Sequence, residues 1–207
     1  MENKNKETGM EIVKNKEGFK KFTSFIFEIV KIAVIAFVIV APIRYFLFQP
    51  FIVSGASMDP NFATGDYLIV DEISYRFFDP QRGDVVVFNA GFIKDPSGQY
   101  GYAGQRFIKR VIGLPGETVD ITNGEVEIIK DGKTTILDEK YLPNDLKTIG
   151  EINMTLKTDE YFVLGDNRQY SYDSRAWGVV LRKDIIGKAF LRIFPVTTLS
   201  EISRPSY

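Results

Sequence analysis

Four short segments of this chain contain residue types that could do chemistry. They are Ser54–Pro60, Gly83–Phe88, Phe107–Gly116 and Gly165–Arg175. The first contains Ser57 among small residues, the third contains Lys109 in a largely apolar run, and the last combines aspartates, serines and arginines. Each segment by itself is typical of an ordinary turn or strand, so any chemistry must come from their combination.

The absence of two residue types narrows that chemistry. The chain has no cysteine, which excludes a disulfide framework, a thiolate nucleophile and a cysteine zinc site. It has no histidine, which excludes the Ser-His-Asp triad and histidine zinc sites. A hydrolase built from this sequence must therefore take its general base from a carboxylate, a lysine or a tyrosine.

Lys109 is the lysine whose setting suits a general base. If residues 107–112 form a strand, Phe107, Lys109 and Val111 share one face and Arg110 points to the other. Apolar neighbours favour burial of the amine, and burial lowers a lysine pKa from about 10.4 by several units. The alternative, an edge lysine whose amine reaches water, is favoured by this strand taken alone.

The four segments together resemble the motifs of the type I signal peptidases, bacterial serine proteases with a Ser-Lys dyad. Ser57–Pro60 matches the family's Ser-Met-x-Pro motif, and Lys109–Gly116 matches its Lys-Arg-Val-Ile-Gly-Leu-Pro-Gly motif. Gly83–Phe88 matches its strand motif, and Gly165–Arg175 matches the Gly-Asp-Asn-Arg motif at every fixed position. The resemblance extends from about residue 20 to residue 195 and implies a membrane-bound endopeptidase.

The resemblance also implies a role for individual residues. It implies that Ser57 is the nucleophile, that Lys109 is the general base and that Ser171 orients the lysine through a hydrogen bond. Gly165 matches a position where the backbone passes close to the dyad, and Asp173 and Arg175 match a structural ion pair. The positions that line the substrate pockets are matched by Met58, Phe107 and Ile108. It implies no metal and no cofactor. The implied substrates are the signal peptides of exported preproteins, cut after small residues of the Ala-x-Ala type.

The sequence departs from the family pattern at two places near Ser57. Asn61-Phe62 follows the proline where the family usually has Thr-Leu. Gly55 stands two residues before the nucleophile, where some members carry a hydroxyl that binds the oxyanion, and Ser54 lies one residue further upstream. The oxyanion site is therefore expected to rest on the Ser57 backbone N–H, with any contribution from Ser54 left open.

The N-terminal part of the chain is expected to anchor the protein in a lipid bilayer. Residues 1–21 are polar and lysine-rich, whereas residues 22–43 contain only two charges. A helix over this apolar stretch would be about 33 Å long, which suits a membrane span. Two other interpretations of this stretch are a cleaved signal peptide and a buried core helix. The first lacks support because no small-x-small cleavage site follows the stretch. Lysines before the span predict a cytoplasmic N-terminus.

The rest of the chain is expected to be mainly β. Short β-branched or aromatic runs alternate with turns, and Asn123-Gly124 and Asp131-Gly132 are hairpin dipeptides. The expected strands are 67–70, 85–88, 107–112, 119–121, 126–129, 134–137, 161–164 and 185–193. They predict a folded-sheet or barrel-like catalytic domain. Residues 89–104, with four glycines, are expected to form a long mobile loop.

These observations predict the boundaries of three parts of the chain. We expect a cytoplasmic tail at 1–21, a transmembrane helix at 22–44 and an extracytoplasmic catalytic domain at 45–207. Within that domain the core covers about 50–114 and 159–195, and a hairpin-rich insertion covers about 115–158. The protein is expected in the inner membrane of a bacterium as a monomer.

Its 26 basic and 27 acidic residues nearly balance, which speaks against nucleic acid as a partner.

Two other classes of function deserve comparison. A self-cleaving Ser-Lys repressor shares the expected fold type and dyad but carries a DNA-binding domain in place of a membrane span. A catalytically inactive relative that binds export substrates would be expected to have lost Ser57, Lys109 or Ser171, and all three are present.

Overall fold

The computed structural model describes residues 22–40, 48–95, 97–144 and 146–207. The chain forms two compact units, Met1–Phe46 and Leu47–Tyr207. The expected tail at 1–21 and residues 41–44 of the expected span lie outside the described residues.

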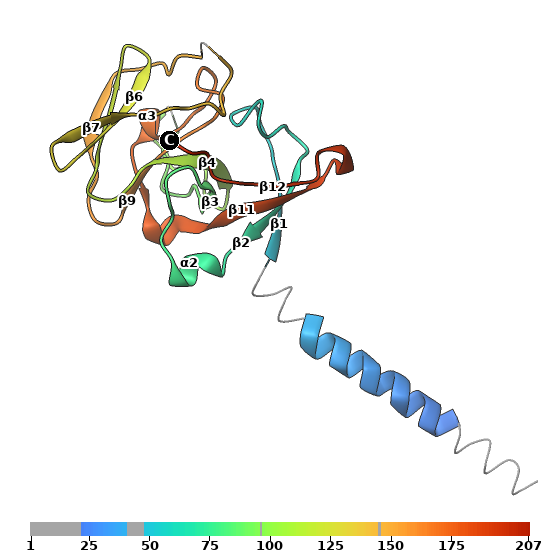
Figure 1. The fold of residues 1–207 in the computed structure, drawn as a ribbon. Helices are drawn as coiled ribbons and strands as arrows, with labels where there is room; N and C mark the ends of the chain where they lie inside the picture. The colour runs from blue at the N-terminus through green and yellow to red at the C-terminus, as the bar shows by residue number, and fades with distance from the viewer. Residues whose placement is uncertain (1–21, 41–47, 96, 145) are drawn as a thin grey trace, which may run out of the picture. The chain divides into compact units, whose positions relative to one another are not determined.

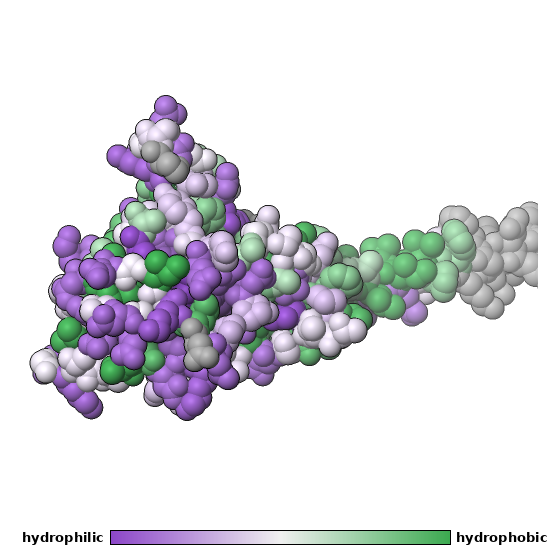
Figure 2. Space-filling model, turned by 90° about the horizontal axis from the view of Figure 1, so that it is seen from above, coloured by the Kyte–Doolittle hydropathy of each residue, from purple (hydrophilic) through white to green (hydrophobic). Residues whose placement is uncertain are grey.

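The described part of the first unit is one apolar helix, Phe22–Val40, of 19 residues. Its mean hydropathy is 2.4 and none of it is buried. At 1.5 Å per residue it is about 28 Å long, close to the thickness of a bilayer core. Figure 2 shows this helix as apolar, whereas the face of the second unit seen there is largely hydrophilic.

The second unit is built from two antiparallel sheets, which confirms the expected mainly β fold. The larger sheet contains β1 (Phe48–Ile52), β2 (Tyr67–Asp71), β3 (Val85–Asn89), β4 (Arg106–Gly113), β9 (Glu160–Leu164), β10 (Val180–Leu181), β11 (Ile185–Phe194) and β12 (Ser200–Glu201). Its order is β1-β2-β11-β3-β4-β9-β10, and β12 pairs with β11. The smaller sheet contains β5 (Thr118–Thr122), β6 (Glu125–Lys130), β7 (Lys133–Ile136) and β8 (Ile152–Thr155).

The smaller sheet lies within the range expected for a hairpin-rich insertion. Its strand order is β7-β6-β5-β8, and two tight turns connect its first three strands. Both turns have positive φ angles at each central residue: 55° and 87° at Asn123-Gly124, and 50° and 75° at Asp131-Gly132. Asn, Asp and Gly tolerate this conformation best, which explains why the two dipeptides mark hairpins correctly. In Figure 1, β6 and β7 lie at the opposite side of the unit from β1, β2 and β11.

The larger sheet is buried on both faces at its centre. Side chains of β3 alternate between two apolar clusters, with Val86 and Phe88 in one and Val85 and Val87 in the other. A strand covered on both faces reads as a continuous apolar run, as Val85–Phe88 does in the sequence. The neighbouring strand, β4, is thereby held rigidly, and it carries Lys109.

Several short elements were not predicted from the sequence. They are β1, β8, β10 and β12, the one-turn helices α2 (Ser74–Phe77) and α3 (Ser174–Trp177), and the 3₁₀ turns Arg182–Asp184 and Val196–Thr198. Elements this short carry too little periodicity to detect. β1 also contains Pro50, which is tolerated because β1 is an edge strand paired only with β2.

The segment expected as a mobile loop is partly packed. Asn89 ends β3, and Ala90 and Ile93 are buried in the core. The Tyr172 hydroxyl donates a hydrogen bond of 2.8 Å to the Lys94 carbonyl, which ties the loop to a distant part of the chain. Phe92 and Tyr102 also pack against this core.

Candidate active site

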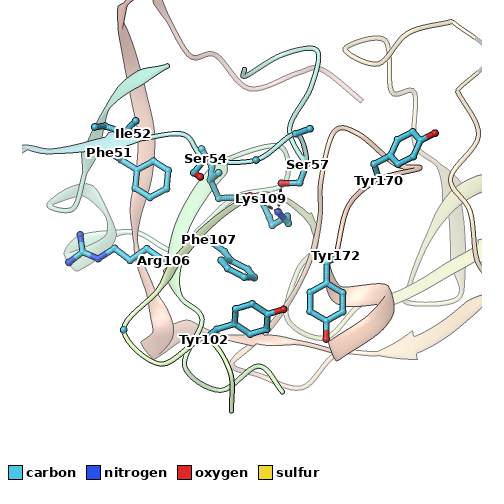
Figure 3. A pocket seen from close by; sticks show the side chains of 14 residues that line it. Phe51, Ile52, Ser54, Ser57, Tyr102, Arg106, Phe107, Lys109, Tyr170 and Tyr172 are labelled. Carbon is cyan, nitrogen blue, oxygen red and sulfur yellow. Dashed lines mark hydrogen bonds between the residues drawn. The ribbon is translucent and has the colours of Figure 1, made fainter. Parts of the chain in front are cut away.

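Ser57 and Lys109 meet at the surface of the larger sheet. The Lys109 Nζ atom donates a hydrogen bond of 2.6 Å to Ser57 Oγ and a second of 3.0 Å to the Ile108 carbonyl (Figure 3). Ser57 lies in the loop that follows β1, and Lys109 lies in β4 opposite Val86 of β3. The two residues are 52 positions apart in the sequence, so only the fold brings the hydroxyl and the amine together.

The Lys109 amine is in an apolar setting. The residue is 4% exposed, and its Nζ lies 5.7 Å from the centre of the Phe107 ring. Burial lowers the pKa of Lys109 from 10.5 to about 8, although the buried carboxylates of Asp173 and Asp166 oppose this shift. A lysine with a pKa near 8 carries a substantial neutral fraction at neutral pH, which a general base requires.

The loop that carries Ser57 is held by the segment after β9. The Asn167 backbone N–H donates to the Ser57 carbonyl at 3.0 Å, and its side-chain amide donates to the Ala56 carbonyl at 3.0 Å. A Cβ atom on Gly165 would overlap the Ser57 carbonyl and the Ser171 side chain, so only glycine fits there. Asn167 was not singled out from the sequence, although it lies inside the last of the four motifs.

The Ser57 backbone N–H is available for an oxyanion. No acceptor within the described residues binds it, and it lies beside the nucleophile's own hydroxyl. Ser54 is exposed and lines the same cavity as Ser57. The second possible donor is therefore present at the site.

Ser171 does not make the hydrogen bond that the resemblance implies. Its Oγ is buried, and it has no hydrogen-bond partner among the described residues. Lys109 instead uses the Ile108 carbonyl as its second partner. Ser171 packs against Gly165 next to Ser57, so it lies in the site without contacting the lysine through a hydrogen bond.

Asp173 and Arg175 form a two-pronged ion pair under the site. The Arg175 Nε and Nη2 atoms donate to the two Asp173 carboxylate oxygens, both at 2.8 Å. The Asp173 carboxylate also accepts from the Gly165 N–H at 3.1 Å and caps α3 through the Arg175 N–H. Its side chain is fully buried, which excludes the alternative of a weak surface pair.

Replacing Asp173 with alanine should destabilise the fold. The change removes the carboxylate that pairs with the Arg175 guanidinium and accepts from the Gly165 N–H. Breaking a buried pair in this way costs about 3–5 kcal/mol. Chemical denaturation measures the loss in free energy of unfolding. The matched control is Asp138→Ala, because Asp138 pairs with Lys140 on the surface and such pairs contribute about 0–1 kcal/mol. Equal losses in the two variants would contradict the assignment.

A second buried ion pair was missed from the sequence. The Arg110 Nε and Nη2 atoms donate to the two Asp166 carboxylate oxygens at 2.8 and 2.6 Å, and both side chains are buried. Arg110 follows Lys109 in β4 and Asp166 follows Gly165, so the pair joins the two motifs behind the dyad. The signal that could have found it is the alternation of β4, which turns Arg110 away from water on the face opposite Lys109.

A cavity of about 560 Å³ opens beside the dyad. Ile108 lines it together with Phe51, Ile52, Tyr102 and Phe107. Figure 3 labels the last four of these residues. Met58, which was expected to line the substrate pockets, is fully buried in the cluster with Val53, Phe62 and Leu68 and is not among the residues that line this cavity. The motif gives the position of Met58 but not the direction of its side chain.

One edge of β4 is free along the cavity. β3 pairs with β4 over Arg106–Arg110, whereas β9 covers the other edge only from Arg110 to Gly113. Within the described part of the chain, no strand pairs with the outer edge at Arg106–Lys109. Such an edge can accept an extended peptide as an additional strand.

No cluster of three or more acidic side chains that could hold a metal ion occurs among the described residues.

Comparison with known proteins decides the family. A family model described as signal peptidase, peptidase S26, matches residues 26–194. The chain belongs to this family of signal peptidases. Signal peptidase I of Leptolyngbya laminosa is 40% identical over 190 residues, 89% of this chain and 88% of that protein. Signal peptidase I P of Bacillus subtilis subsp. natto is 36% identical over 187 residues, 86% and 94% of the two chains.

The signal peptidase match includes all four sequence motifs and confirms the resemblance drawn from them. It begins in the apolar helix and ends at Phe194, the last residue of β11. A crystal structure of a signal peptidase I from Enterococcus faecalis V583 is 30% identical and covers 54% of this chain and 97% of that chain, with a TM-score of 0.42.

Proposed function

We propose that this protein is a membrane-anchored signal peptidase I that cleaves preproteins with a Ser57–Lys109 dyad. The observation that carries the proposal is the 2.6 Å contact between Lys109 Nζ and Ser57 Oγ, made by a lysine that is 4% exposed. A nucleophile within hydrogen-bond reach of a base of lowered pKa is the arrangement that covalent catalysis requires.

The acylation step uses the neutral form of Lys109. Its amine takes the proton from Ser57 Oγ as the oxygen attacks the carbonyl carbon of the scissile bond. The new oxyanion accepts a hydrogen bond from the Ser57 N–H, and Ser54 is the candidate for a second donor. The protonated lysine then gives its proton to the leaving amine. This releases the mature protein and leaves the signal peptide as an ester on Ser57.

The deacylation step repeats the same proton transfers with water. Neutral Lys109 takes a proton from a water molecule, whose oxygen attacks the ester carbonyl. The lysine then returns a proton to Ser57 Oγ, and the signal peptide leaves with a free carboxylate. No step calls for a metal or a cofactor.

Four residues are proposed to position this machinery. Gly165 lets the backbone pass close to Ser57, and the Asp173–Arg175 pair holds Gly165 through its N–H. Ser171 is proposed to orient the lysine, because its buried Oγ, which has no hydrogen-bond partner among the described residues, lies against Gly165 next to Ser57.

The substrate is proposed to bind as an added strand on β4. The residues before the cut pair with the free edge at Arg106–Lys109, which places the scissile carbonyl next to Ser57. Beyond Arg110 the edge is taken by β9, so the residues after the cut must leave the sheet. Phe107 and Ile108 supply apolar surface for the small side chains at the first and third positions before the cut.

The helix Phe22–Val40 is proposed as the membrane anchor. Its length and hydropathy suit a bilayer, and the lysines before it favour a cytoplasmic N-terminus. The catalytic domain then lies on the outer face of the inner membrane, where signal peptides emerge. Enzyme and substrate are thereby confined to one surface, which raises their effective concentration.

The test is cleavage of a preprotein by the full chain in lipid vesicles. We expect one cut after an Ala-x-Ala sequence, verified by N-terminal sequencing of the mature product. Replacing the alanine before the cut with a bulky residue should stop cleavage, while a bulky residue at the intervening position should not. A chain that folds but leaves the intact preprotein uncut would refute the proposal.

A further inference from the structure

The loop that carries Ser57 is held by two kinds of contact. Met58 and Phe62 anchor it by packing into an apolar cluster, and such packing is not directional. Hydrogen bonds are directional, so they decide how the loop is turned about this anchor. One of them is the 3.0 Å bond from the Asn167 backbone N–H to the Ser57 carbonyl. A second bond on the other side of the anchor would stop the loop from pivoting about the first.

Asn61 supplies this second attachment, four residues after Ser57. Its side-chain Nδ2 donates to the Asp166 carboxylate at 2.9 Å and to the Tyr141 carbonyl at 3.0 Å. An amide NH2 group carries two donors, and both are used here. Asp166 directly precedes Asn167, so the two attachments of the loop lead to the same segment after β9.

The carboxylate that accepts from Asn61 is itself fixed. Asp166 is 0% exposed, and the Arg110 guanidinium donates to both of its oxygens, at 2.8 and 2.6 Å. Arg110 follows Lys109 in β4. The Asn61 amide therefore joins the loop that carries the nucleophile to the strand that carries the base, by a route separate from the dyad contact.

The carbonyl that accepts from Asn61 belongs to the segment between β7 and β8. The Tyr141 ring faces the Arg110 guanidinium, 4.3 Å from its carbon atom, and the Tyr141 hydroxyl accepts from Arg168 at 2.9 Å. The segment that accompanies the smaller sheet is thus held against the catalytic core. Asn61 lies where this segment, the Ser57 loop and the segment after β9 meet.

The side chain of Asn61 is held mainly by these two bonds. The residue is half-buried and borders a second cavity, of about 230 Å³, together with Phe62, Arg110, Tyr141 and Arg192. A side chain beside a cavity has close-packed neighbours on one side only, so packing constrains it weakly. The Asn61 carbonyl accepts from the Arg192 guanidinium, and this backbone contact does not depend on the side chain. Substitution of Asn61 therefore isolates the role of the amide.

We propose that Asn61 is a positioning residue for Ser57, whose amide holds the nucleophile loop to Asp166 and Tyr141 and so sets the approach of the Ser57 hydroxyl to Lys109. This inference rests on the proposed function. It concerns a position where the chain departs from the family pattern, which usually has threonine after the proline. A threonine hydroxyl carries one donor and can make only one of the two bonds.

The test replaces Asn61 with leucine, which has a similar size and no donor. The full chain in detergent micelles should cleave a preprotein with a kcat about 100-fold lower and a KM within about threefold, because misplacement of a reacting group by about 1 Å costs a rate of this order. Asn61→Thr should lose only about fivefold, the range of one missing hydrogen bond. The matched control is Asn153→Leu, because the Asn153 amide donates to Asp120 on the exposed smaller sheet, and it should leave the rate unchanged.

Reaction with a penem separates positioning from folding. A penem acylates Ser57, so the amount of labelled protein counts the folded sites and the labelling rate reports how reactive each site is. Positioning predicts nearly complete labelling of Asn61→Leu at a rate about 100-fold below that of the unaltered chain. A merely structural role would lower the labelled amount and leave the rate per site unchanged.

That structural outcome overturns the inference, as does an Asn61→Thr variant that is as slow as Asn61→Leu. If Asn61→Leu does not fold, Asn61→Thr decides, and a labelling rate per site equal to that of the unaltered chain overturns the inference. An unaltered chain that neither cleaves a preprotein nor reacts with the penem overturns the proposed function as well, so the two failures are distinguishable.

Discussion

Replacing Lys109 with methionine should lower the rate of preprotein cleavage on the order of 10⁴-fold. Methionine keeps most of the side-chain volume and removes the amine, so Ser57 loses the group that accepts its proton at 2.6 Å. General-base catalysis contributes about 10²–10⁴-fold, and the effect is at the upper end because an unassisted serine hydroxyl is a weak nucleophile. Ser57→Ala should cost at least as much, since both residues act as a unit. Single-turnover cleavage in micelles measures both losses.

The control for this prediction separates catalysis from folding. Lys157→Met removes a lysine whose side chain is 86% exposed, and it should leave the rate unchanged. The Lys109→Met variant should also unfold no more easily than the unaltered chain at pH 6, because it no longer buries an ammonium group. A Lys109→Met protein that stays folded and still cleaves within tenfold of the original rate would rule out the dyad.

The pH dependence of kcat/KM should follow the titration of Lys109. Burial lowers its pKa to about 8, and only the neutral amine acts as a base. The rate should therefore rise about tenfold per pH unit below pH 8 and level off above it, so that at pH 6 it is about 100-fold below its plateau. A series of cleavage assays from pH 5.5 to about 9.5 measures the curve.

An independent readout makes this prediction specific. Acylation of Ser57 by a penem, followed by mass spectrometry, should show the same midpoint, because it needs the same proton transfer without the leaving amine. A flat profile across this range, or a midpoint near 6, would contradict a lysine base.

The contribution of Lys109 to the stability of the fold should also increase with pH. The pKa of Lys109 is lowered in the folded protein, whereas the unfolded chain keeps the ordinary value of 10.5. Between about pH 8 and 10.5 the unfolded state therefore binds more protons, and this residue's contribution makes the fold more stable as pH rises through that window. Lys109→Met should lose this contribution.

The sequence by itself determined the features that depend on local pattern. Short β-branched and aromatic runs located the strands that carry Lys109 and the core. The Asn123-Gly124 and Asp131-Gly132 turns marked their hairpins because these residues tolerate positive φ angles best. The absence of histidine and cysteine narrowed the possible catalytic groups before any fold was known. The four motifs then supplied the family.

Only the tertiary structure decided what depends on packing between distant segments. The burial of Lys109, and hence its pKa, comes from neighbours contributed by β3, the Ser57 loop and the segment after β9. Packing also turned Met58 into the core and left the Ser171 hydroxyl without a hydrogen-bond partner in the described part of the chain, although the motif marks both positions equally well. The contact between the Tyr102 and Tyr172 rings is not predicted by any local sequence pattern, because the two residues are 70 positions apart and meet only when the chain folds.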